Sequence, residues 1–216
     1  MTQDKKISNG VNSSRKFLED QVCPQVSNLI CQAFKKVDRK LFVPSRWINY
    51  AYSDSAIPLD GDSSISQPSL VAQMIDLLDL TGKERVLEIG TASGYSTAIL
   101  SLCCKKVDTI EIDPELGENA KGRLKLLGFK NVSVHIGDGS LGIPSKAPFD
   151  AIVVTAAAQE VPQPLIDQLK EGGRMVIPIQ MEEPDMQELF VCLKLNDRLI
   201  KKPIIPVRFV PLVEGK

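Results

Sequence analysis

The residues best suited to bind a ligand form a short turn, Glu88-Ile89-Gly90-Thr91-Ala92-Ser93-Gly94-Tyr95. An apolar run typical of a strand precedes the turn at Arg85–Ile89, and apolar residues at helical spacing follow it. A turn of this kind lies at the carboxyl end of a strand, where doubly wound folds bind nucleotides. Gly90 and Gly94 let the backbone approach a ligand without an intervening Cβ. A tight strand-to-helix connection with no ligand is the alternative that the turn alone leaves open.

The spacing of the glycines separates the possible cofactors. Gly90 and Gly94 stand in the order G-x-x-x-G, with Ala92 at the middle position, whereas a dinucleotide fingerprint is G-x-G-x-x-G. The turn also lacks a P-loop lysine. From Glu88 onward the pattern resembles the first motif of S-adenosylmethionine methyltransferases, E-x-G-x-G-x-G. We therefore expect S-adenosyl-L-methionine as cofactor and S-adenosyl-L-homocysteine as product, and we disfavour a nicotinamide dehydrogenase.

Acidic residues follow the next two predicted strands. Glu111 lies about 20 residues after the glycine turn, where an acid accepts hydrogen bonds from both ribose hydroxyls. Asp113 is the alternative ribose partner. The other alternative is that Glu111 is a solvated loop acid without a role in binding. Asp138 lies between Gly137 and Gly139, where many methyltransferases place an acid that accepts from the adenine amino group.

Strands and helices alternate along most of the chain. This order predicts an α/β, Rossmann-like methyltransferase fold, with a mostly parallel doubly wound sheet, an antiparallel edge and N-terminal helices. A Gly172-Gly173 pair indicates the C-cap of the last predicted helix. The predicted strands are Arg85–Ile89, Val107–Ile112, Val132–Ile136, Ala151–Val154, Met175–Ile179, Leu189–Leu195 and Val207–Leu212. The predicted helices lie at about Val22–Val37, with Pro24 in the first turn, and at Pro68–Leu78, Tyr95–Cys103, Pro114–Leu127 and Pro164–Lys170.

A mobile tail at residues 1–14 and a single methyltransferase domain at 15–216 are the expected organisation. Within the domain we expect an N-terminal helical and loop cap at 15–80, a cofactor-binding core at 81–180, and C-terminal strands lining the substrate site at 181–216. The irregular stretch from Arg39 to Ser66 belongs to the cap, and its aromatic residues predict that it is packed.

Composition limits the functional classes. Hydrophobic residues make up 43% of the chain, enough for a sizeable core, and the formal net charge of −1 disfavours nucleic acid as a main partner. The N-terminus does not read as a signal peptide, and no apolar stretch is long enough for a membrane helix. Five cysteines without a C-x-x-C pair predict neither a zinc site nor a disulfide framework, which favours a cytoplasmic location. The single histidine, His135, lies in a predicted strand and favours a structural role.

Several separate stretches together resemble the protein-L-isoaspartate O-methyltransferase family, from about residue 25 to the C-terminus. Departures from the family pattern are Ser64 for threonine, Ala92 for the middle glycine, and Asp62-Ser63 for a more usual glycine and glutamine. The matching stretches are Arg39-Lys40-Leu41-Phe42-Val43-Pro44, Ala51-Tyr52-Ser53-Asp54, Ile57-Pro58-Leu59, Ser64-Ile65-Ser66-Gln67-Pro68, Gly137-Asp138-Gly139, Ala147 to Ala157 and Arg208-Phe209-Val210-Pro211-Leu212.

The resemblance implies methyl transfer to the free carboxylate of L-isoaspartyl residues in damaged proteins and peptides. Ser66 is the implied catalytic residue, since its hydroxyl beside a helix N-terminus can hold a carboxylate; a plain N-cap is the alternative. The implied substrate-binding residues are Ser66, Val207, Arg208, Phe209, Val210 and Pro211. The implied cofactor-binding residues are Ser64, Ile65, Gln67, Glu88, Gly90, Thr91, Gly94, Tyr95, Glu111, Ile112, Asp138, Gly139 and Thr155.

Two other functions stay open at this point. A methyltransferase of the same fold could act on a small-molecule acid, and a non-catalytic module could bind isoaspartyl groups without turnover. We expect damaged proteins as partners, no metal, no nucleic acid, no membrane, and a monomeric state.

Overall fold

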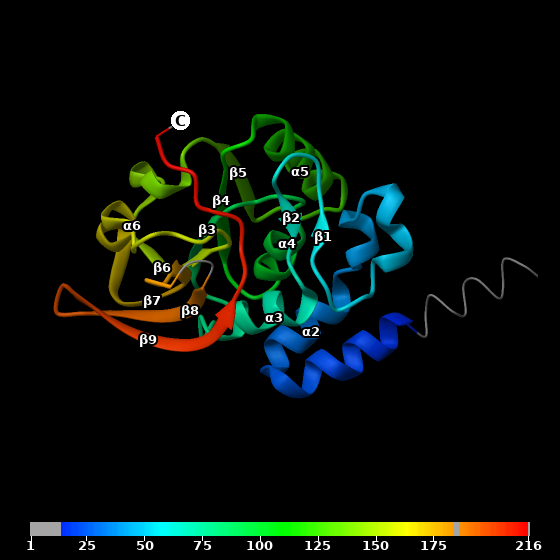
Figure 1. The fold of residues 1–216 in the computed structure, drawn as a ribbon, viewed down its shortest axis with the longest axis horizontal. Helices are drawn as coiled ribbons and strands as arrows, with labels where there is room; N and C mark the ends of the chain where they lie inside the picture. The colour runs from blue at the N-terminus through cyan, green and yellow to red at the C-terminus, as the bar shows by residue number, and fades with distance from the viewer. Residues whose placement is uncertain (1–13, 184–185, 216) are drawn as a thin grey trace, which may run out of the picture.

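The structure is a computed structural model that describes residues 14–183 and 186–215. Its main sheet contains β3 (Arg85–Ile89), β4 (Lys106–Glu111), β5 (Val132–Ile136), β6 (Phe149–Val154), β7 (Leu169–Gln180), β8 (Gln187–Leu195) and β9 (Arg198–Val207). The strand order is β5-β4-β3-β6-β7-β8-β9 (Figure 1). Strands β3 to β7 pair in parallel, whereas β8 and β9 pair antiparallel. The predicted fold class is therefore confirmed.

Helices follow β3, β4 and β6, in keeping with the predicted alternation. Helices α3 (Pro68–Asp76), α4 (Tyr95–Ser101), α5 (Pro114–Leu126) and α6 (Gln163–Gln168) lie around the sheet (Figure 1). Alternate residues of the central strands point to opposite faces. Val86 and Val153 pack into one core with the N-terminal helices, and Leu87, Ile152 and Val154 pack into a second core with α6. Both faces of the sheet are thus buried, as parallel sheets require.

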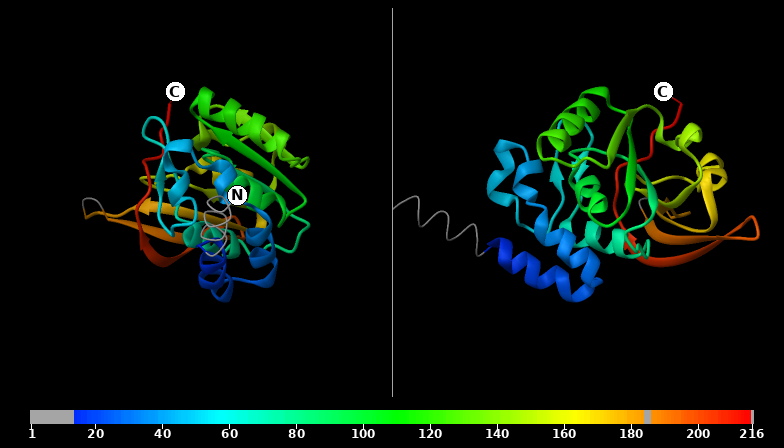
Figure 2. Two further views of the ribbon diagram at one scale, coloured as in Figure 1. Left: turned by 90° about the vertical axis from the view of Figure 1, so that its right-hand side faces the viewer. Right: turned by 180° about the vertical axis from the view of Figure 1, so that it is seen from behind.

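The predicted helix from Val22 to Val37 is wrong at its start, because the α-helix there begins at Asn28 and a separate helix precedes it. A helix over residues 14–22 ends in the 3₁₀ turn η1 (Cys23–Gln25), and α2 (Asn28–Lys36) follows. Pro24 explains the break, since proline lacks an N–H and disfavours helical backbone in the residue before it. Figure 2 shows both helices at the end of the molecule remote from the β8–β9 hairpin. The predicted tail lies, apart from Ser14, outside the described residues.

A disulfide joins Cys23 and Cys31, with 4.9 Å between their Cα atoms. The cysteine pattern had argued against a disulfide framework, and it missed this local pair. The chain reverses between the helix over 14–22 and α2, which brings the two side chains together. Spacing alone does not reveal such a reversal.

The irregular stretch before α3 is packed, as its aromatic content predicted. It contains η2 (Arg39–Phe42), η3 (Ser45–Tyr50) and a small antiparallel pair, β1 (Ile57–Pro58) and β2 (Ser64–Ile65). Phe42, Ala51 and Ile65 are buried in the first core. Short 3₁₀ turns η4 (Gly139–Leu141) and η5 (Pro144–Lys146) follow β5.

The prediction that Gly172-Gly173 caps α6 is wrong, because both glycines lie inside β7. The register between β6 and β7 shifts there, between Phe149 and Ala151. A Cβ on Gly173 would lie 2.9 Å from the carbonyl oxygen of Asp150, so only glycine allows this close strand approach. The glycines therefore mark an irregularity in the pairing of β6 with β7 rather than a helix end.

The last predicted strand, Val207–Leu212, is also wrong in its bounds. The ladder with β8 uses Arg198–Val207 instead, and its register shifts opposite Leu189 and Phe190, where Pro203 and Pro206 lie on the sheet edge. The chain then leaves the sheet and runs back across the molecule (red in Figure 1). There it makes a single parallel bridge, Ala157 with Pro211.

Candidate functional site

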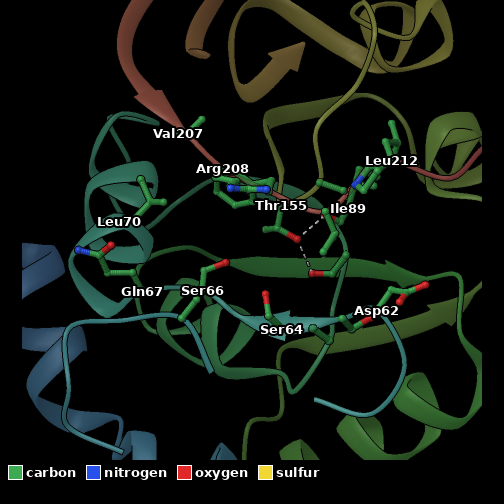
Figure 3. A pocket seen from close by; sticks show the side chains of 18 of the residues that line it. Asp62, Ser64, Ser66, Gln67, Leu70, Ile89, Thr155, Val207, Arg208 and Leu212 are labelled. Carbon is green, nitrogen blue, oxygen red and sulfur yellow. Dashed lines mark hydrogen bonds between the residues drawn. The ribbon is translucent and has the colours of Figure 1, made fainter. Parts of the chain in front are cut away.

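A cavity of about 760 Å³ opens at the carboxyl ends of β3, β4 and β6 (Figure 3). The sequence-predicted residues in its wall are Ser64, Ser66, Gln67, Gly90, Glu111, Ile112, Gly139, Thr155, Val207, Arg208, Phe209, Val210 and Pro211. Ile65, Thr91 and Tyr95 line a hollow of about 30 Å³ that shares Ser66 and Gly90 with the cavity. Glu88, Gly94 and Asp138 lie outside the walls of both. The structure thus gathers most of the predicted residues in one place.

Gly90 lies in close contact with Thr155, the residue that follows β6. The φ of Gly90 is +92°, and a Cβ there would clash with Oγ1 of Thr155. The Thr155 hydroxyl donates to the carbonyls of Ile89 and Gly90, each at 2.9 Å (dashed lines in Figure 3). A side chain at position 90 is therefore excluded both by backbone conformation and by contact.

Glu111 lines the cavity at the end of β4 with 5% of its surface exposed. Its Oε2 accepts a 2.7 Å hydrogen bond from the backbone N–H of Ala92, and Oε1 accepts from Asp113 N at 3.1 Å. Asp113, the alternative ribose partner, caps α5 by accepting from Glu115 N and Leu116 N. Of the two acids, Glu111 is therefore the one facing the cavity.

Asp138 lies just outside the cavity, beside the wall residue Gly139. Its Oδ1 accepts from the backbone and hydroxyl of Ser140, and its Oδ2 accepts from Gly215 N at 2.6 Å. Burial opposes its ionisation, but the hydrogen bonds from Ser140 and Gly215 outweigh burial and lower the pKa of Asp138. The C-terminal segment therefore reaches the carboxylate that the sequence assigned to the adenine amino group.

Glu88 is completely buried beneath the glycine turn. Oε2 accepts from the hydroxyls of Thr97 and Thr109, at 2.5 and 2.7 Å, and Oε1 has no hydrogen-bond partner among the described residues. Burial raises the pKa of Glu88 to about 7, against the hydrogen bonds from these hydroxyls. Glu88 is thus a buried residue below the cavity wall. A direct contact of Glu88 with the cofactor stays a prediction.

Ser66 precedes α3, and its side chain points toward the cavity (Figure 3). The residue at the N-cap position is Gln67, whose side chain makes no cap hydrogen bond. Asp54 satisfies the start of α3 instead, because it accepts from Ser69 N at 2.9 Å and from Gln67 Nε2 at 3.0 Å. The capping task is therefore met by Asp54, which leaves the Ser66 hydroxyl for the cavity.

The segment Val207–Pro211 forms the wall opposite Ser64 and Ser66 (Figure 3). Gln187, which the sequence did not single out, holds this segment by accepting from Phe209 N at 2.6 Å and donating to Phe209 O at 3.1 Å. Val210 O accepts from Ala157 N. Part of the backbone of the predicted substrate-binding segment is therefore already hydrogen-bonded within the protein.

Sequence reasoning missed Ser69, Leu70 and Gln73, which line the cavity from α3. They lie three, four and seven residues after Ser66, so helical spacing from the predicted helix start would have found them. His135 lies elsewhere, paired with buried Asp108 at 3.0 Å, in keeping with the structural role predicted for it. Further wall residues are Ala56, Asp62, Ser63, Ile89, Ala92, Ile110, Ala156, Ile205, Pro206, Leu212 and Val213.

The chain's own groups fit an adenosyl cofactor without phosphate. Gly90 brings bare backbone into the cavity wall, with the Thr155 hydroxyl where a side chain would lie, and the Glu111 carboxylate faces the cavity at the end of the neighbouring strand. A turn that joins β3 to α4 with these partners defines a Rossmann-like methyltransferase dependent on S-adenosyl-L-methionine. Residues 17–216 match the family of protein-L-isoaspartate(D-aspartate) O-methyltransferases, and the chain belongs to this family. The resemblance seen in the sequence is thereby confirmed.

Individual relatives are similar in sequence to this chain over most of its length. A protein-L-isoaspartate O-methyltransferase of Dictyoglomus turgidum is 49% identical over 186 residues, which is 86% of this chain and 84% of the relative. One from Vibrio cholerae is 46% identical over 201 residues, 92% of this chain and 93% of the relative. A solved protein-L-isoaspartate O-methyltransferase superposes with a TM-score of 0.86 at 34% identity, covering 93% of this chain and 66% of that chain.

A solved Plasmodium falciparum relative in complex with S-adenosyl-L-homocysteine has a TM-score of 0.79, with coverage of 93% of this chain and 99% of that one. Its sequence identity of 24% supports the shared fold alone.

Proposed function

We propose that the protein is a repair enzyme that methylates the free carboxylate of L-isoaspartyl residues in damaged proteins and peptides. The observation that carries this function is a single cavity in which the cofactor turn at Gly90 faces the Ser64–Ser66 segment and the Val207–Pro211 segment. Family membership supports the same reaction. The product methyl ester closes to a succinimide, whose hydrolysis returns some normal aspartate.

The chemistry demands little acid–base assistance. S-adenosyl-L-methionine supplies an electrophilic methyl group on a sulfonium, which leaves as a neutral thioether when the new O–CH₃ bond forms and the S–CH₃ bond breaks. An isoaspartyl carboxylate resembles a C-terminal carboxyl, with a pKa of about 3.5, so it is ionised at neutral pH. The chain therefore has no proton to remove, and its task is to orient the acceptor and exclude water, which supplies roughly 7–11 kcal/mol in well-positioned reactions.

Residue roles follow from position in the wall or, for Asp138, directly beside it. Glu111 binds the ribose hydroxyls, the glycine turn with Thr155 holds the amino-acid part, and Gly139 with Asp138 borders the adenine. Ser66 orients the acceptor carboxylate, and Val207 to Pro211 contact the peptide around it. We infer the same division for the chain, with a cap at 15–80, a cofactor core at 81–180 and substrate-lining strands at 181–216.

The setting in which the enzyme works belongs to the same proposal. We infer a monomer that acts in the cytoplasm on proteins, without nucleic acid or membrane as partner. Within residues 14–183 and 186–215, no helix is long and apolar enough to cross a membrane. A reducing cytoplasm would keep Cys23 and Cys31 as thiols, although the two side chains are close enough to form a disulfide. Mass spectrometry of alkylated thiols from freshly lysed cells measures the state of the pair, and a fully oxidised pair would contradict the cytoplasmic location.

Transfer of a labelled methyl group tests the function. The acceptors are an isoaspartyl peptide, its aspartyl twin and a panel of small carboxylic acids, each with saturating cofactor. We expect the label in the isoaspartyl peptide alone, with methanol released later as the ester decays. Label in a small acid would instead identify a small-molecule methyltransferase, and cofactor binding without transfer would identify a non-catalytic module.

A further inference from the structure

The guanidinium of Arg39 is buried beside the cavity, with only 1% of the residue exposed. It donates hydrogen bonds to backbone carbonyls of the segment that leads to Ser66. Nη1 donates to the carbonyls of Ala51 and Ser53 at 3.2 and 3.0 Å. Nη2 donates to the carbonyls of Ser55 and Ser66 at 2.9 and 3.2 Å. One side chain thus ties residues 51–66 together.

The same guanidinium also contacts the cofactor side of the site. Its Cζ lies 5.7 Å from the ring centre of Tyr95, the first residue of α4 after the glycine turn. The Tyr95 ring in turn packs edge-on against Phe42. Arg39 therefore lies between the turn that binds the cofactor and the segment that carries Ser66.

A buried charge held in this way requires a functional or structural reason, because its removal from water is costly. Burial lowers the pKa of Arg39, and the negative charge of Asp54 opposes this effect. A planar fork of fixed donors suits several carbonyls at once, whereas a lysine presents one ammonium and cannot reach partners on both sides. The fork is therefore specific to arginine.

We propose that Arg39 is a positioning residue for methyl transfer, which fixes the Ser66 hydroxyl relative to the glycine turn. This inference rests on the proposed function, because the readout is isoaspartyl methylation. A displacement of about 1 Å in an oriented reaction costs on the order of a hundredfold in rate. Arg39→Lys is therefore expected to lower turnover about 10- to 100-fold. Cofactor affinity should stay within about threefold, since the bonds that hold Glu111 and Gly90 do not involve Arg39.

A double-mutant cycle separates positioning from general stability. Turnover is measured under single-turnover conditions for wild type, Arg39→Lys, Ser66→Ala and the double variant, well below every melting temperature. If Arg39 acts through Ser66, the turnover of the double variant should lie within about twofold of that of Ser66→Ala. The reason is that the effects of substituting two coupled residues do not add.

Asn131→Ala provides the matched control. Asn131 Nδ2 likewise ties backbone carbonyls together, those of Ser101, Cys104 and Lys105, but at the turn before β4 and outside the cavity wall. Its substitution is expected to lower the melting temperature while turnover stays within twofold, with or without Ser66→Ala. Arg39→Gln serves in the cycle if Arg39→Lys does not fold.

Two results would overturn the inference. The first is a turnover of Arg39→Lys at the wild-type level. The other is an Arg39 effect of equal size whether or not Ser66 is first replaced, which would make Arg39 a stabilising residue only. An inactive wild type would instead reject the proposed function and is recognised before the cycle begins.

Discussion

The two sides of the cavity are built differently. On the cofactor side, Gly90 and Glu111 lie at the ends of adjacent parallel strands, held by ladder hydrogen bonds. On the acceptor side, the segment before α3 and the segment after β9 lie outside the main sheet. Short backbone pairings hold these segments together with side chains: Arg39 and Asp54 for the first, and Gln187 for the second.

The difference separates the binding of the cofactor from the recognition of the acceptor. A cofactor site at strand ends is a property of the fold and is shared by methyltransferases with unrelated acceptors. Acceptor specificity resides in loops placed on that scaffold, which tolerate change. We therefore expect substitutions on the cofactor side to alter cofactor affinity, and substitutions on the acceptor side to alter turnover.

Ser66→Ala tests the acceptor side and should have the largest effect. Loss of a group that orients the acceptor is expected to lower turnover about a hundredfold, since each 1.36 kcal/mol of barrier is about tenfold in rate. Stability should change little, because Asp54 rather than Ser66 satisfies the start of α3. Single-turnover transfer and a thermal melt measure the two quantities. A lowered melting temperature with near-normal turnover would make Ser66 a structural residue.

Glu111→Ala tests the cofactor side. We expect cofactor affinity to fall by about 1.5–3 kcal/mol, the range for a charged hydrogen-bonding partner, as measured by calorimetric titration. Asp113→Ala is the control, because Asp113 caps α5 and should cost about 0.5–2 kcal/mol of stability without weakening the cofactor. Equal affinities for wild type and Glu111→Ala would remove the ribose role from Glu111.

Glu88→Gln tests whether the buried acid under the turn serves the fold or the cofactor. The folded-state pKa of about 7 lies above the ordinary value of 4.5, so the neutral carboxyl stabilises the fold below about pH 4.5. That contribution is lost as pH rises through about 7. At pH 8 the glutamine variant should therefore be more stable than wild type, by about 2–3 kcal/mol. Between pH 5 and 8, the stability of Glu88→Gln should also depend less on pH than the stability of wild type does.

Denaturant unfolding at several pH values checks this prediction. The same pH dependence of stability in wild type and in Glu88→Gln over that interval would contradict it. Cofactor titration of the same samples decides whether Glu88 also has the binding role predicted from the sequence, which requires a loss of affinity on substitution.

Ala92→Gly should have the smallest effect. Ala92 has a φ of +46°, a conformation that disfavours side chains, and its N–H donates to Glu111. Glycine should relieve about 1 kcal/mol of backbone strain, offset in part by the greater freedom of the unfolded chain. We expect a stability change within about 1 kcal/mol and cofactor affinity within about threefold. A tenfold gain in affinity would show that the alanine methyl obstructs the cofactor.

Periodicity and turn chemistry were enough to predict the parallel core of the fold. Strands β3 and β5 match their predicted bounds, and Glu111 was located by its distance from Gly90. Gly172-Gly173 misled because glycine serves both helix ends and strand bulges, and only the partner strand distinguishes them.

The contacts that hold the acceptor side could not be predicted. Arg39 was visible as part of a motif, but its bond to Ser66 spans 27 residues. Asp54 reaches α3 across 15 residues, and Gln187 reaches Phe209 across 22. Such pairings depend on the folded path of the chain and leave no local spacing in the sequence.

The most direct measurement follows an isoaspartyl peptide and its aspartyl twin by chromatography over repeated rounds of methylation and ester decay. With enzyme and S-adenosyl-L-methionine, we predict that the isoaspartyl form declines while the aspartyl form and methanol accumulate. Without cofactor, the isoaspartyl form should persist. An isoaspartyl peptide that stays unchanged although calorimetry shows bound cofactor would contradict the repair function.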